Sequence, residues 1–145
     1  MVRLQLHELR TGKRAGELAR LVETLAEDGR RLAVWVEDEG RRQIFDDFLW
    51  TFDRLAFVPH ALGQPSLGEV DDPVVLLGEP ANPNRATVLV VGDGLPSADW
   101  ARGFDEVHDL IPPGVEGEER RQWWRLWSEE AGNGGRREER WCCGF

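Results

Sequence analysis

Apolar residues recur at helix spacing and at strand spacing in turn along the first part of the chain. Leu18, Leu21, Val22 and Leu25 fall at i, i+3, i+4 and i+7, which predicts an amphipathic helix packed on a sheet. Apolar segments of strand length precede and follow this helix. A strand, a helix and a strand in so short a unit predict a parallel pair of strands.

The same kind of pattern continues over most of the chain. Gly29 is the expected C-cap of the first helix, and Asp38 is the expected N-cap of the second. The elements together predict an α/β fold, a single-domain sandwich with a mainly parallel central sheet and helices on both faces, which is Rossmann-like. We expect a domain over residues 1–131 and a loosely held C-terminal tail over residues 132–145. The predicted strands cover residues 4–9, 31–36, 74–77, 87–91 and 106–111. The first predicted helix lies between a turn over residues 11–15 and Gly29, the second runs from its cap Asp38 to about residue 51, and two more cover residues 99–104 and 117–131.

Size and charge narrow the class of protein. A chain of 145 residues is long enough for one domain with its own core. A formal net charge of −9 argues against direct nucleic-acid binding, because proteins that neutralise phosphates present a basic face. We therefore expect protein partners, and a local cluster of arginines in the last fifth of the chain could accept an acidic peptide. The cluster consists of Arg120, Arg121, Arg125, Arg136, Arg137 and Arg140.

The sequence suggests neither a membrane segment nor a metal or cofactor site. No apolar run approaches the roughly 20 residues of a membrane span, and the N-terminus lacks the apolar segment of a secretory signal, so we expect a cytoplasmic protein. Cys142 and Cys143 are adjacent and close to the end of the chain, where they cannot close a useful loop or form a zinc site unaided. We interpret them as incidental thiols and expect no cofactor.

Two clusters of aromatic residues look like binding surface. Leu49-Trp50 with the segment 57–60 forms the first, and the run 120–127, which sets arginines among tryptophans, forms the second. An aromatic ring beside a guanidinium suits a partner with an apolar side chain and a carboxylate. If Ile44, Phe45, Phe48 and Leu49 face the core, the helical step leaves Trp50 at least partly exposed.

Helical geometry also sorts the tryptophans of the second cluster. It puts Trp124 on the border between an apolar face and a basic face that also carries Arg121 and Arg125. We expect Trp35, Trp123 and Trp127 to belong to the core.

Five segments taken in order resemble the chi subunit of bacterial DNA polymerase III. They are Val36-Glu37-Asp38-Glu39 after a buried strand, Leu49-Trp50 at a helix end, Phe57-Val58-Pro59-His60, Val88-Leu89-Val90-Val91, and Val107-His108-Asp109-Leu110-Ile111-Pro112 before an Arg-Gln-Trp-Trp-Arg helix. The resemblance covers nearly the whole chain. It implies a noncatalytic subunit of the clamp-loader assembly that binds the acidic C-terminal tail of the single-stranded DNA-binding protein and so meets DNA only indirectly. A psi-like clamp-loader subunit is the second partner that it implies.

The resemblance also implies a tail pocket. The ring of the tail's terminal phenylalanine would enter an apolar slot, its carboxylate would meet an arginine, and the tail's aspartates would follow the basic rim. One residue has to be dropped between Pro113 and Arg121 to keep the register, so Trp123 or Arg120 could hold the roles of their neighbours. The pocket falls on Trp50, Phe57, Ile111, Arg121, Trp124 and Arg125.

Two other classes of function stay open. A nucleotide-binding α/β enzyme could use Gly92-Asp93-Gly94 after a strand together with His60 and His108, but the Gly-x-Gly-x-x-Gly fingerprint and the phosphate-loop Lys-Ser/Thr pair are missing. Asp93 fits a turn residue, and His108 fits a local hydrogen bond. A metal cluster at Glu37-Asp38-Glu39 is disfavoured because adjacent side chains at a strand end diverge. The second class is a generic peptide-binding scaffold.

Overall fold

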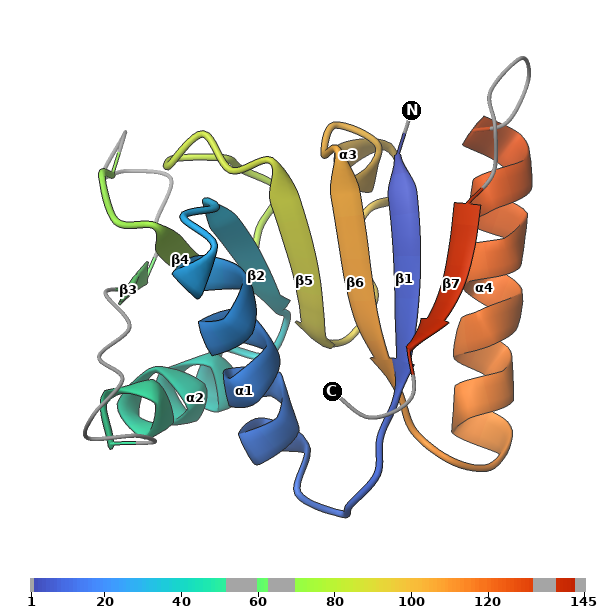
Figure 1. Cartoon of the computed structure of the whole chain (residues 1–145), viewed down its shortest axis with the longest axis horizontal. Helices are drawn as coiled ribbons and strands as arrows, with labels where there is room; N and C mark the ends of the chain where they lie inside the picture. Colours follow the sequence, from blue (N-terminus) through green and yellow to red (C-terminus); the bar gives the residue numbers. More distant parts are fainter. Residues whose placement is uncertain (1, 52–59, 63–69, 132–137, 143–145) are drawn as a thin grey trace.

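A computed structural model describes residues 2–51, 60–62, 70–131 and 138–142. Its centre is a seven-stranded sheet in the order β3-β4-β2-β5-β6-β1-β7, and every pair of neighbouring strands is parallel (Figure 1). The α/β class is therefore confirmed. The strands are β1 Arg3–Glu8, β2 Leu32–Val36, β3 His60–Leu62, β4 Val74–Leu77, β5 Val88–Asp93, β6 Glu106–Ile111 and β7 Glu138–Cys142. The helices are α1 Arg14–Glu27, α2 Glu39–Thr51, α3 Ala98–Ala101 and α4 Val115–Ala131.

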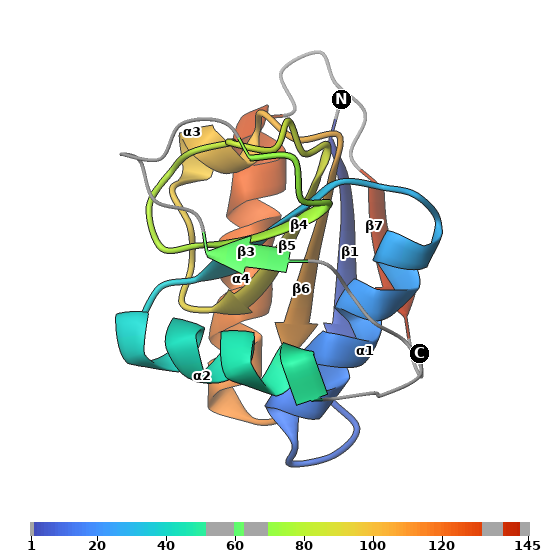
Figure 2. The ribbon, with the colours of Figure 1, turned by 90° about the vertical axis from the view of Figure 1, so that its left-hand side faces the viewer.

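Helices cover both faces of the sheet, as the pattern predicted. Figure 2 shows α1 and α4 on opposite sides of the strands. Two separate groups of buried residues follow from this arrangement. The first joins α1 and α2 to side chains such as Val34 and Val90, and the second joins α3 and α4 to side chains such as Leu6 and Leu89. Alternation along each strand produces the two groups, because successive side chains point to opposite faces.

Local signals set the end of α1 and the start of α2 where the sequence suggested. Asp38 caps α2, because its Oδ2 accepts a hydrogen bond from the Arg41 amide at 2.9 Å. Gly29 follows α1 with a left-handed φ of +77°, which glycine adopts at little cost. Helix α4 begins at Val115, two residues earlier than predicted, directly after Gly114 with φ +82°.

The pattern missed two strands at the edges of the sheet. β3 has three residues, and β7 lies in the segment expected to be a loosely held tail. Residues Glu138–Cys142 instead pair in parallel with β1, opposite Arg3 to His7, which corrects that expectation for this part of the tail. An edge strand with the sequence Glu-Glu-Arg-Trp-Cys lacks the apolar alternation that identifies inner strands, and charged residues are typical of such edges.

Candidate peptide-binding site

Helix α4 turns a different face to the sheet from the one that the sequence predicted. Trp124 was expected on a border accessible to a peptide, but its side chain is fully buried, while Leu126 is 49% exposed. The buried arc of α4 includes two polar residues and a glycine, which an analysis of apolar spacing assigns to the outside. Its members are Gly117, Arg120, Trp124, Trp127 and Ser128.

A buried cluster around Asp109 explains this orientation. Asp109 lies on β6 and is fully buried, and its two carboxylate oxygens accept from Arg120 Nε at 3.0 Å and Arg120 Nη2 at 2.8 Å. Trp124 Nε1 donates to the same carboxylate at 2.6 Å, and the Leu110 amide donates at 2.8 Å. A buried carboxylate and a buried guanidinium are tolerated only when they are paired and hydrogen-bonded in this way. Arg120 is therefore committed to Asp109, which disfavours it as the residue that grips a ligand carboxylate.

The tryptophans of α4 pack against one another over the second core group. Trp124 meets Trp123 and Trp127 edge to face, with ring centroids 4.7 Å and 5.1 Å apart. Trp127 is buried, and its Nε1 donates to the Ala98 carbonyl at 2.9 Å. Trp35 is also buried and Trp123 is half-buried, so the prediction of core tryptophans is confirmed for Trp35 and Trp127 and holds in part for Trp123.

Arg121 and Arg125 are the accessible residues of the predicted site on α4, and we call them the arginine flank of α4. The 100° helical step puts these two residues about 40° apart around the axis and Trp123 about 160° from both. Arg121 is half-buried and donates through Nη2 to Glu8 Oε1 at 2.9 Å. Arg125 is exposed and donates to the neutral amide oxygen of Gln122 at 3.2 Å. Trp123 therefore does not stand beside the two arginines.

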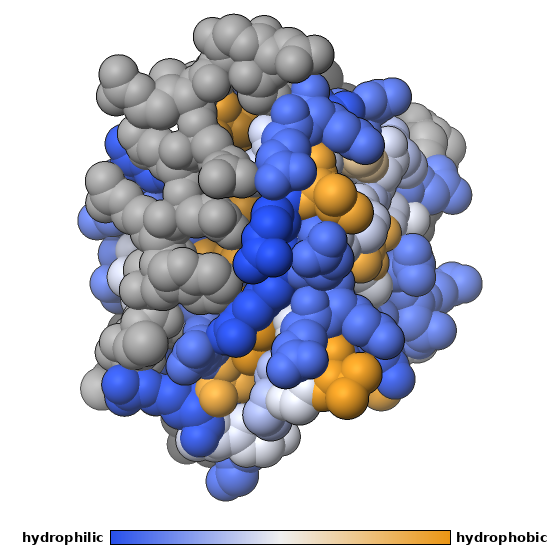
Figure 3. Space-filling view, turned by 90° about the vertical axis from the view of Figure 1, so that its right-hand side faces the viewer, coloured by the Kyte–Doolittle hydropathy of each residue, from blue (hydrophilic) through white to orange (hydrophobic). Residues whose placement is uncertain are grey.

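The surface around α4 is mixed rather than uniformly basic. Figure 3 shows the side of the molecule where α4 and β7 lie, with a hydrophilic band between hydrophobic patches. Glu118 and Glu129 are exposed, and the helical step puts them on the same side of α4 as Arg125. Any attraction of an acidic partner must therefore come from individual arginine contacts more than from the charge of the whole face.

The other predicted pocket residues do not join this flank. Trp50 is 47% exposed, as expected, but it lies on α2, which is at the opposite end of the sheet from α4 (Figure 1). Ile111 ends β6 and is 1% exposed in the second core group. Phe57 lies outside the described residues. The described residues therefore do not form one slot bordered by Trp50 and Ile111.

A second buried polar cluster was not predicted as a unit. His108 Nε2 lies 2.8 Å from Glu106 Oε1, and His108 Nδ1 lies 2.8 Å from His7 Nε2. The bond from His108, with that from Arg30, lowers the pKa of Glu106 to about 2. Burial, with the neighbouring His108, lowers the pKa of His7 to about 4. The prediction that His108 makes a local hydrogen bond is confirmed.

Among the described residues, no group of three or more histidine, cysteine and acidic side chains could hold a metal ion. Asp38, from the acidic run after β2, serves as the cap of α2. No helix in the described part of the chain is both long enough and apolar enough to cross a membrane.

The fold and the site define a parallel α/β protein whose polar core orients one long helix. The model of the family described as DNA polymerase III chi subunit, HolC, matches residues 1–132, and the chain belongs to this family. A curated relative, the DNA polymerase III subunit chi of Pseudomonas aeruginosa, is 31% identical over 93 residues, which cover 63% of this chain. The match spans 62% of that relative's length.

A solved structure, the C-terminal domain of the SWI2/SNF2 ATPase of Sulfolobus solfataricus, has a TM-score of 0.48 and 16% identity to this chain. The match covers 81% of this chain and 56% of that one.

Proposed function

We propose that the chain is a noncatalytic accessory subunit of the DNA polymerase III clamp-loader assembly and binds the acidic C-terminal tail of the single-stranded DNA-binding protein. Family membership supports the place in the polymerase assembly. The observation that carries the tail site is Arg125. Its guanidinium is exposed on α4, and among the described residues no carboxylate pairs with it. An exposed cation without an acidic partner, on a protein with net charge −9, suits a carboxylate supplied by another chain.

The two arginines of the flank can contact different carboxylates of the tail. Arg121 and Arg125 are one turn apart, so one can grip the terminal carboxylate while the other meets the aspartates. Arg121 already touches Glu8, and an incoming carboxylate would have to share or displace that contact. Arg125 is thus the better candidate for the first contact.

Trp50 lies on α2, toward the other end of the sheet from this flank (Figure 1), so a single terminal phenylalanine cannot place its ring on Trp50 and its carboxylate on Arg125. We therefore assign the tail to α4 and treat Trp50 as a separate exposed surface. Phe57 stays in the proposal through the family resemblance alone. A psi-like subunit is the second proposed partner and rests on family membership.

The test is a calorimetric titration of the full chain with a peptide that copies the tail of the single-stranded DNA-binding protein from the same organism. The family resemblance implies that the terminal ring of the tail is buried. Burying a phenylalanine ring is worth about 2 to 3 kcal/mol, so a peptide without its last residue should bind at least about tenfold more weakly. Equal affinity for the two peptides would contradict the tail site.

A recruitment assay distinguishes tail binding from DNA binding. Bare single-stranded DNA at physiological salt should not retain the chain, because its net charge is −9. DNA coated with the tailed protein should retain it, whereas DNA coated with a tail-deleted form should not.

A further inference from the structure

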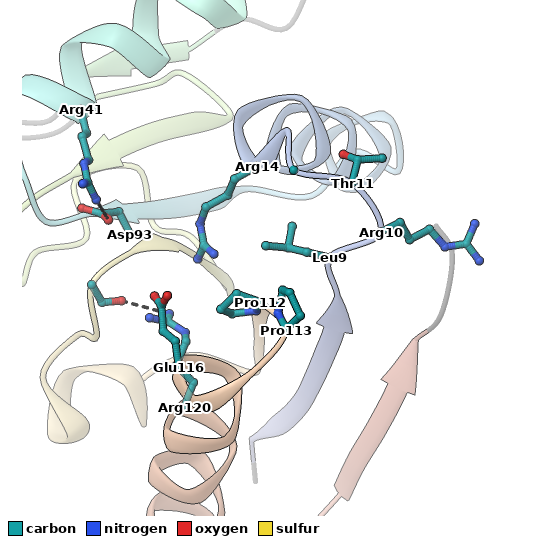
Figure 4. Close-up of a pocket in the computed structure, with 12 residues that line it drawn as sticks. Leu9, Arg10, Thr11, Arg14, Arg41, Asp93, Pro112, Pro113, Glu116 and Arg120 are labelled. Atoms are coloured by element: carbon teal, nitrogen blue, oxygen red, sulfur yellow. Dashed lines mark hydrogen bonds and ion pairs between the residues drawn. The ribbon is translucent and has the colours of Figure 1, made fainter.

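A cavity of about 730 Å³ opens at the carboxyl ends of β1, β5 and β6 (Figure 4). Open α/β sheets bind their ligands at this carboxyl edge. The ligand site lies between two neighbouring strands whose following helices pack on opposite faces of the sheet. β2 and β5 are such neighbours, since β2 leads to α2 over the first core group and β5 leads to α3 over the second. Glu17 already accepts the amides of the loop between β1 and α1, at 2.9 Å from Arg10 and 3.0 Å from Thr11. Side chains must therefore supply most of the contacts to a ligand.

A smaller apolar compartment of about 250 Å³ adjoins the cavity and shares Arg14, Arg41 and Asp93 with it. Its other walls are mostly apolar side chains of α1, α2 and the end of β2. Ile44 belongs to this wall and is 68% exposed, although the sequence pattern assigned it to the core face of α2. An isoleucine this exposed contributes little to the core, and a flat apolar group in the compartment would cover it.

Arg14 lies where the two compartments meet, and Figure 4 shows its guanidinium pointing into the cavity while that of Arg10 points away. It is half-buried and donates to two main-chain carbonyls, from Nε to Gly92 at 2.8 Å and from Nη2 to Leu110 at 3.4 Å. None of the carboxylates in the described part of the chain forms an ion pair with it. Burial lowers the pKa of Arg14, and the nearby carboxylates of Asp109, Glu116 and Asp93 offset this only in part. An anion beside the guanidinium would stabilise its charge.

Two other arginines of the cavity are already paired. Arg41 pairs with Asp93 at 2.6 Å, and Arg120 pairs with the buried Asp109. The N-terminal ends of two helices, α1 with 14 residues and α4 with 17, also face this edge of the sheet, and their dipoles favour a negative group near Arg14. Glu116 lines the cavity near Arg120, where it would repel a long chain of phosphates (Figure 4).

We propose that this cleft binds a nucleoside monophosphate, with the phosphate on Arg14 and the base in the apolar compartment against Ile44. The sugar lies between them, where Asp93 can accept a hydrogen bond from a hydroxyl group. The cleft is separate from the arginine flank of α4, so this ligand and the acidic tail do not compete for the same residues.

The experiment follows amide shifts of the ¹⁵N-labelled full chain during titration with adenosine monophosphate, cytidine monophosphate, adenosine and inorganic phosphate. Residues around the two compartments should shift with either nucleotide, and affinity for the nucleotides should exceed affinity for adenosine and for phosphate at least about tenfold, since each lacks one half of the contacts. Ile44→Ser should weaken nucleotide binding several-fold and spare phosphate binding. Leu126→Ser, at an apolar position of α4 that is 49% exposed and lines neither compartment, is its matched control.

Arg14→Gln should abolish binding of both nucleotide and phosphate, while Arg20→Gln on the exposed side of α1 should leave both unchanged. Ile44→Ser keeps the test decisive if Arg14→Gln does not fold, because Ile44 is largely exposed. Three results would overturn the proposal: no shifts around the cleft at millimolar nucleotide, equal affinity for phosphate and nucleotide, or equal losses in Ile44→Ser and Leu126→Ser. Tail-peptide affinity of the Ile44→Ser sample reports separately on the proposed function and should equal that of the unsubstituted chain.

Discussion

Strands β2 and β6 are both buried along their whole length, yet they are built from different residues. β2 is Leu-Ala-Val-Trp-Val, whereas β6 carries Glu106, His108 and Asp109. Each of the three polar residues of β6 is paired. Glu106 and His108 bond on one face of the sheet to His7 and Arg30, and Asp109 bonds on the other face to Arg120 and Trp124. Strand β2 therefore contributes buried apolar area. Strand β6 contributes buried area too, and its polar side chains also select the elements that pack against it and set the orientation of those elements.

The polar residues of β6 bear on the proposed function because they set the rotation of α4 about its axis. Because Asp109 draws Arg120 and Trp124 inward, the helical step turns Arg121 and Arg125 away from the core. The orientation of the proposed tail site is therefore set by a buried ion pair and not by an apolar stripe.

The largest expected effect is that of removing the carboxylate from β6. Asp109→Leu leaves Arg120 buried without its partner, which should lower the free energy of unfolding by about 3–5 kcal/mol in a urea titration. The double variant Asp109→Leu with Arg120→Met should recover a large part of this loss, because an apolar pair carries no unpaired charge. If the double variant is less stable than Asp109→Leu alone, the charge pair is not the reason for the loss.

The other face of β6 predicts a dependence of stability on pH. Folding lowers the pKa of His7 from 6.5 to about 4, so the unfolded chain binds more protons between these values and stability falls as pH decreases from 6.5 to 4. Glu106, whose pKa falls from 4.5 to about 2, extends the loss below pH 4.5.

The shift of His7 corresponds to a change of up to about 3 kcal/mol. Denaturant titrations of His7→Gln should show a shallower slope between pH 4 and 6.5 and an unchanged slope below pH 4. An identical slope in both proteins above pH 4.5 would show that His7 is not the group that titrates.

A polar group without a partner should be costly in β2. Val34→Thr conserves volume but places a hydroxyl where the neighbours are apolar, so it should lower the free energy of unfolding by about 2 kcal/mol. Thr87→Val, the reverse exchange at an exposed position just before β5, should change it by less than about 0.5 kcal/mol. If Val34→Thr leaves the free energy of unfolding unchanged, β2 accepts an unpaired polar group and does not differ from β6 in the way described.

The sequence predicted the apolar parts of the molecule well. Spacing identified α1, whose Leu18, Leu21, Val22 and Leu25 are all buried, and the bounds of β4 and β6 were correct. It failed where polar residues are buried, since periodicity counts Arg120 as exposed and nothing in the spacing shows that Asp109 neutralises it.

In the candidate site, too, the prediction succeeded where apolar residues fix the rotation of a helix and failed where polar residues do. Trp50 was correctly predicted to be exposed, because the apolar arc of α2 has enough members to fix its rotation even though Ile44 lies outside. Helix α4 has few apolar residues, so its rotation could not be fixed from spacing, and Trp124 was placed on the wrong face. The cleft near Arg14 assembles residues from distant parts of the sequence, and only the sheet order brings them together.

The central claim is that the polar core of β6 presents Arg125 to an acidic tail. The most direct measurement compares Arg125→Glu with Arg20→Glu, which makes the same charge change at an exposed position of α1, in tail affinity and thermal midpoint on the same samples. A charge-assisted contact is worth about 2 kcal/mol, so Arg125→Glu should weaken tail binding by at least about tenfold with little change in midpoint, and Arg20→Glu should change affinity less than about twofold. Equal losses in the two variants would mean that only long-range charge attracts the tail, and a collapse of the thermal midpoint in Arg125→Glu would mean that Arg125 supports the fold.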